Sequence, residues 1–362
     1  MAQTFVMRGV EGKVKKTPAD IPELKPNEVL VKITHSGLCG TDLFYIDPGC
    51  ALGHEGVGTV EKVGSAVTAH KIGDRVGGGY LRSVCFDSIV HEPATRVLAH
   101  STRPQENSLT DNLPTPQSCG QCKYCLTGQD IMCYNRDIYG FAGFSNGTFA
   151  TYYVATEGYI YAIPASMPSE VAAPLQCAGA TVYAALKAYY RTGMRVGVLG
   201  IGGLGHLAIQ FAAKMGAPTT VFSTSPDKEN EARGFGASSF VVLGHEDKLD
   251  EPVDLLLVTA HKAPDWSTFM SEKVVARGAP IVILGALGMT LEFPFLPYFF
   301  NCYNLVTNLV ASRATHAEML AFAAHHDIKP LIEEFPMDEA GMAEAVARLQ
   351  QGKIRYRAVL KA

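Results

Sequence analysis

The sequence lacks the features of a membrane-spanning, secreted or nucleic-acid-binding protein. Its longest apolar stretch, residues 293–310, is interrupted by prolines and asparagines, which a lipid-facing helix would tolerate poorly. The 31 Lys and Arg residues face 35 Asp and Glu, a formal net charge of −4, with no basic block to follow a phosphate backbone. The N-terminal residues show neither a signal-type apolar segment nor an Arg-rich presequence. We therefore expect no membrane or nucleic-acid partner, a cytoplasmic location, and buried strand and loop over 293–310.

Charged residues are sparse, at 18%, and tryptophan occurs once, whereas 47% of the residues are apolar. This balance is typical of a well-buried globular protein and excludes a disordered or fibrous chain. A length of 362 residues exceeds one ordinary hydrophobic core and fits two domains. Nine cysteines in a chain expected in a reducing compartment point to metal binding or catalysis before disulfides.

The pattern of apolar residues changes near residue 174. Before this point, short apolar runs are separated by Gly, Pro and Asn turns, which predicts β-rich structure at 29–33, at 57–63 and around Val76. After it, apolar strands alternate with helical patterns, which predicts βαβ units and a parallel sheet. We expect strands over 196–199, 220–223, 240–243, 255–259, 281–284 and 358–360, and helices over 180–191, 204–215, 227–235, 263–276, 317–326 and 337–351.

A dense group of cysteines lies before this change. Two gaps of two residues and one of seven separate its members: Cys119, Cys122, Cys125 and Cys133. Four thiolates can close a tetrahedron around a zinc ion and leave no open position for chemistry, so this spacing predicts a structural zinc lobe. The alternative, four unrelated buried thiols, would have to produce two successive two-residue gaps by accident.

Other candidate metal ligands are dispersed along the chain. Cys39 stands in the segment Gly-Leu-Cys-Gly-Thr-Asp, His54 stands in Gly-His-Glu-Gly-Val-Gly, and Cys177 comes much later. Two soft thiolates and an imidazole leave a fourth position for water or a substrate oxygen, which is how a catalytic zinc site is built. Any one of the three alone would more often be a buried packing residue.

A glycine-rich turn follows the strand expected at 196–199 and opens the helix expected at 204–215. Glycines here permit a tight turn and the close approach of a pyrophosphate to the helix N-terminus. Because strand, turn and helix occur in this order, the motif predicts dinucleotide binding rather than a turn that serves helix packing alone. The motif residues are Gly200, Gly202, Gly203, Leu204 and Gly205.

The end of the next strand bears on the choice of dinucleotide. An acidic residue there would accept the ribose 2′-hydroxyl of NAD, but this sequence has three small hydroxyl side chains and a nearby lysine. These groups suit the 2′-phosphate of NADP, so we expect NADP in preference to NAD. The alternative is that they are ordinary turn residues before Asp227, a candidate helix cap. The residues concerned are Ser223, Thr224, Ser225 and Lys228.

In this order the three motifs resemble the zinc-containing medium-chain alcohol dehydrogenases, in particular their cinnamyl-alcohol-dehydrogenase-like branch. The resemblance covers nearly the whole chain except 84–118. It implies an α/β protein with a GroES-like β-barrel catalytic domain, formed by 1–173 and 312–362, and a doubly wound parallel-sheet Rossmann domain over 174–311. It also implies a homodimer or homotetramer, with a dimer edge near 305–311.

The resemblance implies a role for each matching residue. Cys39, His54 and Cys177 correspond to the ligands of a catalytic zinc, with Glu55 as an alternating fourth ligand or near neighbour. With the cysteine lobe, this implies two zinc ions per chain. Zinc would polarise a carbonyl oxygen, and the nicotinamide would exchange hydride with an aromatic or aliphatic alcohol or aldehyde.

Two further residues acquire roles in the same way. Asp42 corresponds to the carboxylate that holds the metal-binding histidine in the required tautomer. Thr41 corresponds to the hydroxyl that passes a proton between the substrate oxygen and the cofactor ribose.

Two departures from the family pattern bear on function. Many members end the proton relay with a histidine three residues after the threonine, where this sequence has Phe44. The missing relay weakens alcohol oxidation at neutral pH more than carbonyl reduction, which favours the reductive direction. The segment 84–118 shows no sustained hydrophobic period. We expect it to be either a lineage-specific loop or the translation of an unspliced intron.

Two alternatives to an alcohol dehydrogenase or aldehyde reductase stay open. One is a biosynthetic imine or enal reductase on the same scaffold, and the other is a non-catalytic cofactor-binding relative, against which the intact ligand set argues. The short span between Cys39 and His54 prevents the substrate from being copied from the family. Candidate pocket residues, which would equally fit a hydrophobic core, are Phe44, Tyr45, Leu52 and Phe299.

Overall fold

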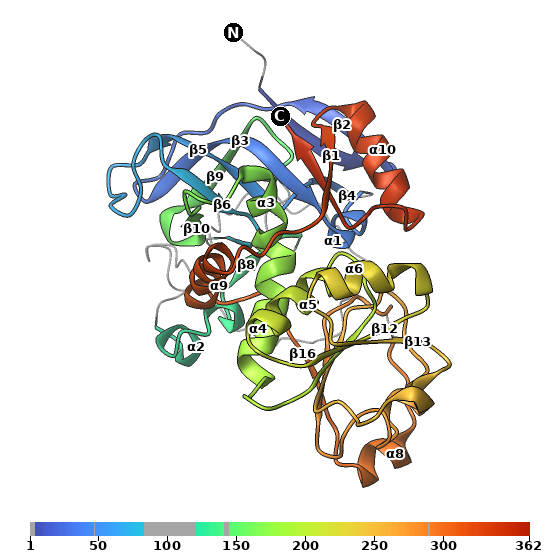
Figure 1. Cartoon of the computed structure of the whole chain (residues 1–362). Helices are drawn as coiled ribbons and strands as arrows, with labels where there is room; N and C mark the ends of the chain where they lie inside the picture. The colour runs from blue at the N-terminus through green and yellow to red at the C-terminus, as the bar shows by residue number, and fades with distance from the viewer. Residues whose placement is uncertain (1–3, 47, 83–120, 141–144, 289) are drawn as a thin grey trace, which may run out of the picture.

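The computed structural model describes residues 4–46, 48–82, 121–140, 145–288 and 290–362. Figure 1 shows that both ends of the chain, in blue and red, share one part of the molecule, whereas the middle of the chain forms the other. The expected ligand Cys119 and the expected insert fall outside the described residues. Within the described part of the chain, no helix is long and apolar enough to cross a membrane.

Strands from both chain ends build the larger sheet. Its central strand β3 (Glu28–Leu38) pairs antiparallel with β5 and with β18, the last strand of the chain. Alternate residues of β3, including Val29, Val31 and Ile33, lie in one buried hydrophobic cluster, as the two-residue period of a strand requires. The order is β10 (Ile160–Ala162), β6 (Arg75–Gly78), β5 (Gly56–Val63), β3, β18 (Arg357–Lys361) and β17 (Ile332–Pro336), with β9 (Tyr152–Thr156) also paired with β3.

The middle of the chain forms a six-stranded parallel sheet. Its central strands β11 (Val196–Leu199) and β14 (Leu255–Val258) are buried along their whole length, which is typical of parallel sheets. The strand order reverses between these two strands, and in such sheets the ligand crevice lies at that point. The full order is β13 (Ser239–Val242), β12 (Thr219–Ser223), β11, β14, β15 (Pro280–Ile283) and β16 (Asn304–Thr307).

A nearly continuous helical segment connects the two sheets. Its first part, α3 (Ser169–Pro174), packs on β3, and its last part, α4 (Ala180–Tyr189), packs on α5 (Gly205–Lys214). Pro174 has no N–H to donate, and the regular ladder gives way to a π-helical turn, Leu175–Gly179, directly after it. The π turn is therefore fixed between two packed helical ends.

The other helices are mostly short. The two longer ones begin at side-chain caps, because Ser312 accepts a hydrogen bond from the Thr315 N–H and Asp338 accepts one from the Gly341 N–H. The helices not yet described are α1 (Gly40–Leu43), α2 (Lys123–Leu126), α6 (Glu229–Gly234), α7 (Trp266–Phe269), α8 (Phe295–Phe300), α9 (Arg313–His325) and α10 (Glu339–Gln350). A small three-stranded sheet has the order β2 (Lys13–Pro18), β1 (Phe5–Val10) and β4 (Pro48–Ala51). A two-stranded sheet pairs β7 (Leu81–Arg82) with β8 (Asp137–Ile138).

The expected parallel strands are confirmed, with ends that differ by at most one residue from those predicted. The helix expected at 263–276 is wrong. Asp265 accepts a hydrogen bond from the Ser267 N–H and begins α7, but this helix ends after four residues. Beyond it, Val275 pairs in parallel with Val253, because a β-branched residue fits an extended backbone beside the sheet better than a helix.

The buried strand and loop expected over 293–310 is only half right. β16 is a strand, but α8 is an exposed helix, with Phe295 62% and Phe300 72% exposed. Pro297 is the third residue of this helix, and proline is tolerated in the first turn, where the N–H lacks a helical partner anyway. The prolines therefore argue against a lipid-facing helix but do not prevent this short exposed one.

Candidate metal and cofactor site

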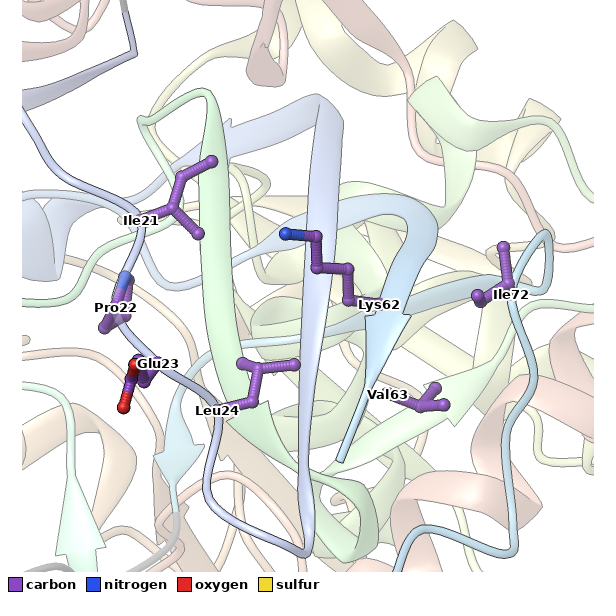
Figure 2. Close-up of a pocket in the computed structure, with 7 residues that line it drawn as sticks. All are labelled: Ile21, Pro22, Glu23, Leu24, Lys62, Val63 and Ile72. Carbon is purple, nitrogen blue, oxygen red and sulfur yellow. The ribbon is translucent and has the colours of Figure 1, made fainter. Parts of the chain in front are cut away.

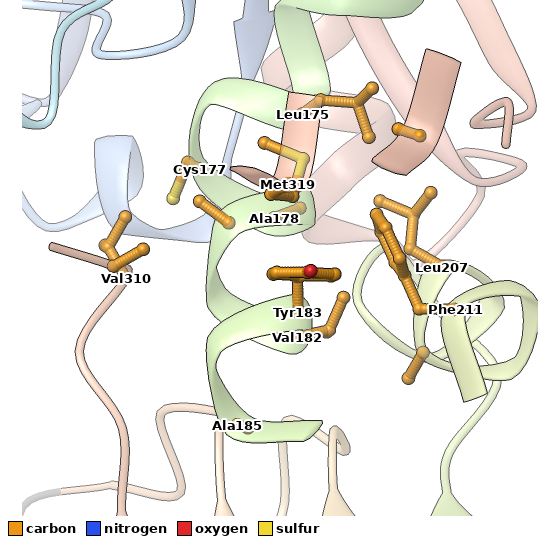
Figure 3. Close-up of a cluster of buried hydrophobic side chains, with 14 of the residues drawn as sticks. Leu175, Cys177, Ala178, Val182, Tyr183, Ala185, Leu207, Phe211, Val310 and Met319 are labelled. Atoms are coloured by element: carbon orange, nitrogen blue, oxygen red, sulfur yellow. The ribbon is translucent and has the colours of Figure 1, made fainter. Parts of the chain in front are cut away.

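Four expected ligands from distant segments come together at the ends of three elements. Cys39 precedes α1, His54 and Glu55 precede β5, and Cys177 lies in the π turn. Each residue offers one ligand atom, and these atoms all lie within 4.8 Å of one another. We call these four residues the catalytic cluster. Figure 3 shows Cys177 on the side of the helical segment opposite Leu207 and Phe211, the same side as Val310.

Asp42 organises the histidine of the cluster. Its side chain accepts hydrogen bonds from the backbone N–H of Cys39 at 2.9 Å and of Gly53 at 3.2 Å, and lies 3.0 Å from Nδ1 of His54. With Nδ1 bound to a carboxylate, the metal-binding nitrogen is Nε2. Among the described residues, Nε2 is buried without a conventional hydrogen-bond partner. The expected tautomer-holding role of Asp42 fits this geometry.

Glu55 lies opposite a residue that sequence reasoning missed. Arg357, on β18, donates from Nη2 to both carboxylate oxygens of Glu55, and both side chains are buried. A Cβ at position 37 would overlap Oε2 of Glu55, so Gly37 makes room for this carboxylate. No local motif marks Arg357, because it stands 302 residues from its partner. Glu55 is thus shared between the cluster and an arginine.

The ionisable groups of the catalytic cluster have pKa values that are shifted in different directions. The hydrogen bond from Cys177 holds the pKa of Cys39 well below its usual value, and the same bond raises the pKa of Cys177. Burial alone would lower the pKa of His54, but Asp42 and Cys39 outweigh it and raise this pKa to about 10. Burial raises the pKa of Glu55 to about 7 against the opposing effect of Arg357. A metal ion that binds here has to displace protons.

The expected relay residue and its neighbours lie close by. Oγ1 of Thr41 is 3.7 Å from Sγ of Cys39, whereas Phe44, at the end of α1, is 65% exposed. Tyr139, which the sequence did not single out, packs against His54 with ring centroids 4.5 Å apart and the planes tilted by 33°, and its hydroxyl accepts a hydrogen bond from the Gly53 N–H. The Tyr139 ring therefore covers one side of the His54 imidazole.

The remaining pocket candidates do not form one group. Leu52 is buried in the hydrophobic cluster beneath β3, so it is core. Tyr45 packs edge-on against Tyr139, with ring centroids 5.2 Å apart. Phe299 is 59% exposed on α8, at the far end of the parallel-sheet part from α1 (Figure 1). Within one chain, Phe299 therefore lies apart from Phe44 and Tyr45.

The described cysteines of the lobe also converge. The Sγ atoms of Cys122, Cys125 and Cys133 lie within 4.8 Å of one another, and we call these three residues the lobe cluster. The first two Sγ atoms are 3.6 Å apart, on either side of the start of α2. Asp130, between the second and third cysteine, is buried and joins the lobe to α9 through two contacts with Arg313.

The glycine turn between β11 and α5 requires glycine at two of its positions. Gly200 has a φ of +93°, and a Cβ at Gly205 would overlap the carbonyl oxygen of Gly200, so the turn between β11 and α5 needs both glycines. A Cβ at Gly202 would meet no atom within 4 Å, so open space borders the turn there. Leu204 and Gly203 complete the turn at the N-terminus of α5.

The residues expected at the 2′-phosphate lie around the end of β12. The Ser225 N–H donates to Oγ of Ser223 at 3.1 Å, and Thr224 is exposed between them. Lys228 reaches back to the glycine turn, because its Nζ donates to the carbonyl oxygen of Ile201 at 3.1 Å. The same Nζ lies 5.3 Å from the ring centroid of Tyr356. The lysine thus stands between the turn and the hydroxyl residues.

A separate open groove lies at the C-terminal end of β5, with a volume of about 470 Å³, and its lining residues are drawn in Figure 2. Its lining includes Lys62 and Val63, at the end of the strand, whereas Glu55 directly precedes the start of the same strand. Eight residues of extended chain separate the two places by roughly 25 Å. The groove is therefore not part of the catalytic cluster. Its lining is Ile21, Pro22, Glu23, Leu24, Lys62, Val63 and Ile72.

Comparison with known proteins agrees with this architecture. Residues 25–92 and 87–165 match the alcohol dehydrogenase GroES-like domain. The chain is 32% identical to an alcohol dehydrogenase of Geobacillus stearothermophilus, over 94% of both chains, and 32% identical to 1,2-dihydrovomilenine reductase of Rauvolfia serpentina, over 92% of this chain and 86% of the relative. A cinnamyl alcohol dehydrogenase from Sorghum bicolor superposes with a TM-score of 0.83 at 27% identity, over 99% of this chain and 97% of the other.

The fold is therefore a GroES-like domain combined with a Rossmann sheet, as expected from the sequence. The chain belongs to the zinc-containing medium-chain alcohol dehydrogenase family, in its cinnamyl-alcohol-dehydrogenase-like branch. Its activity is that of an alcohol dehydrogenase or aldehyde reductase, an oxidoreductase that acts on small molecules.

Proposed function

We propose that this protein is a zinc-dependent aldehyde reductase that uses NADPH in preference to NADH. The observation that carries the proposal is the convergence of Cys39, His54 and Cys177, from three separate segments, into one cluster in which His54 and Cys177 are buried and Cys39 is half-buried. Three such residue types leave one position of a tetrahedron for a substrate oxygen.

The cluster fits zinc by the chemistry of its donors. Two thiols and an imidazole are borderline-soft ligands that suit Zn²⁺, and Nε2 of His54 is a buried donor atom that lacks another conventional partner among the described residues. A zinc ion held there would supply Lewis-acid polarisation of a carbonyl oxygen. Glu55 is the fourth side chain of the cluster, and its bond to Arg357 keeps it from being a permanent ligand.

Asp42 and Thr41 have separate roles in the proposed reaction: Asp42 orients the histidine, and Thr41 passes the proton. Asp42 fixes the orientation of His54 by accepting from Nδ1–H, which leaves Nε2 for the metal. Thr41 places a hydroxyl beside the thiol of Cys39, at the position from which a proton can pass to a reduced carbonyl oxygen. Phe44 cannot continue such a relay, so protons enter by another route, which supports the reductive direction.

The cofactor proposal rests on the end of β12. Ser223, Ser225 and Thr224 offer hydroxyl and N–H donors, and Lys228 offers a positive charge beside the glycine turn. A 2′-phosphate would gain charge-assisted hydrogen bonds here, whereas the 2′-hydroxyl of NAD would find no carboxylate among these four residues. NADPH is thus the cofactor that these side chains favour.

The lobe cluster is proposed to hold a second, structural zinc, with Cys119 as its fourth ligand. We also propose that residues 1–173 and 312–362 form the catalytic domain and 174–311 the cofactor domain. Among the described strands, β16 lies at one edge of the parallel sheet. We propose that a homodimer forms at this edge.

A second candidate function is reduction of an imine or enal. The similarity to 1,2-dihydrovomilenine reductase, a protein whose name denotes a reductase, and the presence of Phe44 favour it. Both candidate functions use the same cofactor residues, so the substrate separates them.

The test is cofactor consumption by the purified full-length protein, with NADPH and NADH in parallel, against aromatic and aliphatic aldehydes, enals and cyclic imines. We expect aldehyde-dependent loss of NADPH that far exceeds the loss of NADH, and two zinc ions per chain by metal analysis. Equal use of NADH contradicts the cofactor proposal, and turnover of enals or imines alone moves the assignment to the second candidate. Full activity in a zinc-free protein contradicts the metal proposal.

A further inference from the structure

The π turn that carries Cys177 is held by a buried side chain next to the candidate ligand. Gln176 is 1% exposed, and its Nε2 donates to the carbonyl oxygen of Ala172, one turn earlier, at 2.9 Å. A Cβ at Gly77 would lie 2.8 Å from Cδ of Gln176, so strand β6 presses directly on the amide. A π turn is a less favourable form of helix than the α-helix, so such contacts are what keep it.

The far end of the same amide meets a buried histidine from α9. Oε1 of Gln176 lies 3.0 Å from Nε2 of His316. Because the Ala172 carbonyl can only accept, the amide nitrogen must face Ala172 and the amide oxygen must face the histidine. His316 therefore donates from Nε2, and its proton is on that nitrogen.

His316 is itself fixed in place. Its ring stacks on Tyr161 with centroids 3.9 Å apart and an angle of 9° between the planes, and it is 4% exposed. α9, which carries the histidine, is tied at its first residue to Asp130 of the cysteine lobe by Arg313. The histidine thus connects a rigid helix to the residue beside Cys177.

We propose that His316 is a positioning residue for the catalytic metal site: through Gln176 it holds the π turn so that Sγ of Cys177 stays within the catalytic cluster. The inference rests on the proposed zinc site. Among the described residues, no hydrogen bond, ion pair or ring contact joins His316 to the four cluster residues, whereas its hydrogen bond to Gln176 leads directly to the π turn. α9 also packs on the π turn through Met319, and His316→Ala leaves that contact in place. Removal of comparable outer partners of metal ligands costs about 10–100-fold in metal affinity or activity.

The test is the rate at which zinc leaves the full-length protein for a colorimetric chelator. Cys177→Ala identifies the release phase that belongs to the catalytic cluster, because this variant should keep the lobe zinc alone. We expect His316→Ala to accelerate the catalytic phase by about 10–100-fold and to leave the lobe phase unchanged. His316→Gln, which keeps an N–H donor near the position of Nε2, should restore most of the wild-type rate.

A matched control separates positioning from general loosening of α9. Leu320 is 2% exposed on the same helix, one turn after His316, and Leu320→Ala removes packing without touching the hydrogen bond. Equal release from His316→Ala and Leu320→Ala, or no rescue by His316→Gln, overturns the inference while the zinc site stands. If Cys177→Ala has the same zinc content as the wild type, the proposed function and this inference both fall.

Discussion

The catalytic cluster and the lobe cluster use the same thiol chemistry but are built in opposite ways. Cys177 of the catalytic cluster stands more than a hundred residues after Cys39, His54 and Glu55, and Cys177, His54 and Glu55 are buried. The three described lobe cysteines lie within twelve residues of one another, and only Cys133 among them is buried. The first cluster is a product of the finished fold, whereas the second can organise its own loop around a metal.

The largest effect should come from removing a thiol of the catalytic cluster. Cys177→Ala leaves too few ligands for a tightly held zinc ion, so we expect kcat to fall by a factor on the order of 10³ or more, equivalent to about 4 kcal/mol. The glycine turn lies on another element, so NADPH affinity, measured by fluorescence titration, should stay within about twofold. A variant that keeps its turnover would exclude zinc catalysis at this cluster.

Most residues of the two clusters, and the glycine turn, could be predicted from the sequence. The lobe spacing and the segments around Cys39 and His54 are local patterns, and the glycine turn follows from strand, turn and helix in sequence order. The bond between Arg357 and Glu55 could not be predicted, because it depends on β18 lying beside β3. The bond between His316 and Gln176 joins residues 140 positions apart, and neither residue belongs to a motif.

The buried ion pair between Arg357 and Glu55 offers the next test of how the catalytic cluster depends on the finished fold. Arg357→Met leaves the carboxylate of Glu55 buried without its counter-charge, so we expect a loss of about 3–5 kcal/mol in the free energy of unfolding. The matched control is Lys361→Met on the same strand, which removes an exposed pair with Glu334 and should cost at most about 1 kcal/mol. Urea unfolding of both variants measures the difference. Equal losses would mean that burial of the first pair is unimportant.

A cysteine of the lobe cluster should affect stability more than chemistry. We expect Cys122→Ser to lower the thermal midpoint by on the order of 5–10 °C, because a structural zinc contributes directly to folding free energy. The kcat per folded molecule at 25 °C should stay within about twofold, since the lobe cluster contains none of the catalytic residues proposed here. A loss of kcat as large as that of Cys177→Ala would erase the distinction between the two clusters.

The smallest expected effect is a pH dependence that arises near the catalytic cluster. Burial lowers the pKa of His316 to about 3, below the ordinary value of 6.5 that it has when unfolded. Between these values the unfolded chain binds the proton and the folded chain does not, so this contribution to stability falls as the pH falls from about 6.5 toward 3. Going from pH 7 to pH 5, His316→Gln should lose about 2 kcal/mol less than the wild type in urea unfolding. An identical loss in both proteins would show that His316 is protonated in the folded state.

The helical segment from α3 to α4 has a mechanical consequence. At one end, α3 packs on β3 of the larger sheet. At the other end, α4 packs on α5, the helix that covers β11 and β12 of the parallel sheet, so the segment acts as a rod held at both ends. Any change of angle between the sheets has to bend this rod, and bending concentrates where the regular ladder is interrupted, at Leu175–Gly179. That pivot carries Cys177, so relative motion of the two sheets would reach the thiol as a displacement of Sγ against Cys39 and His54.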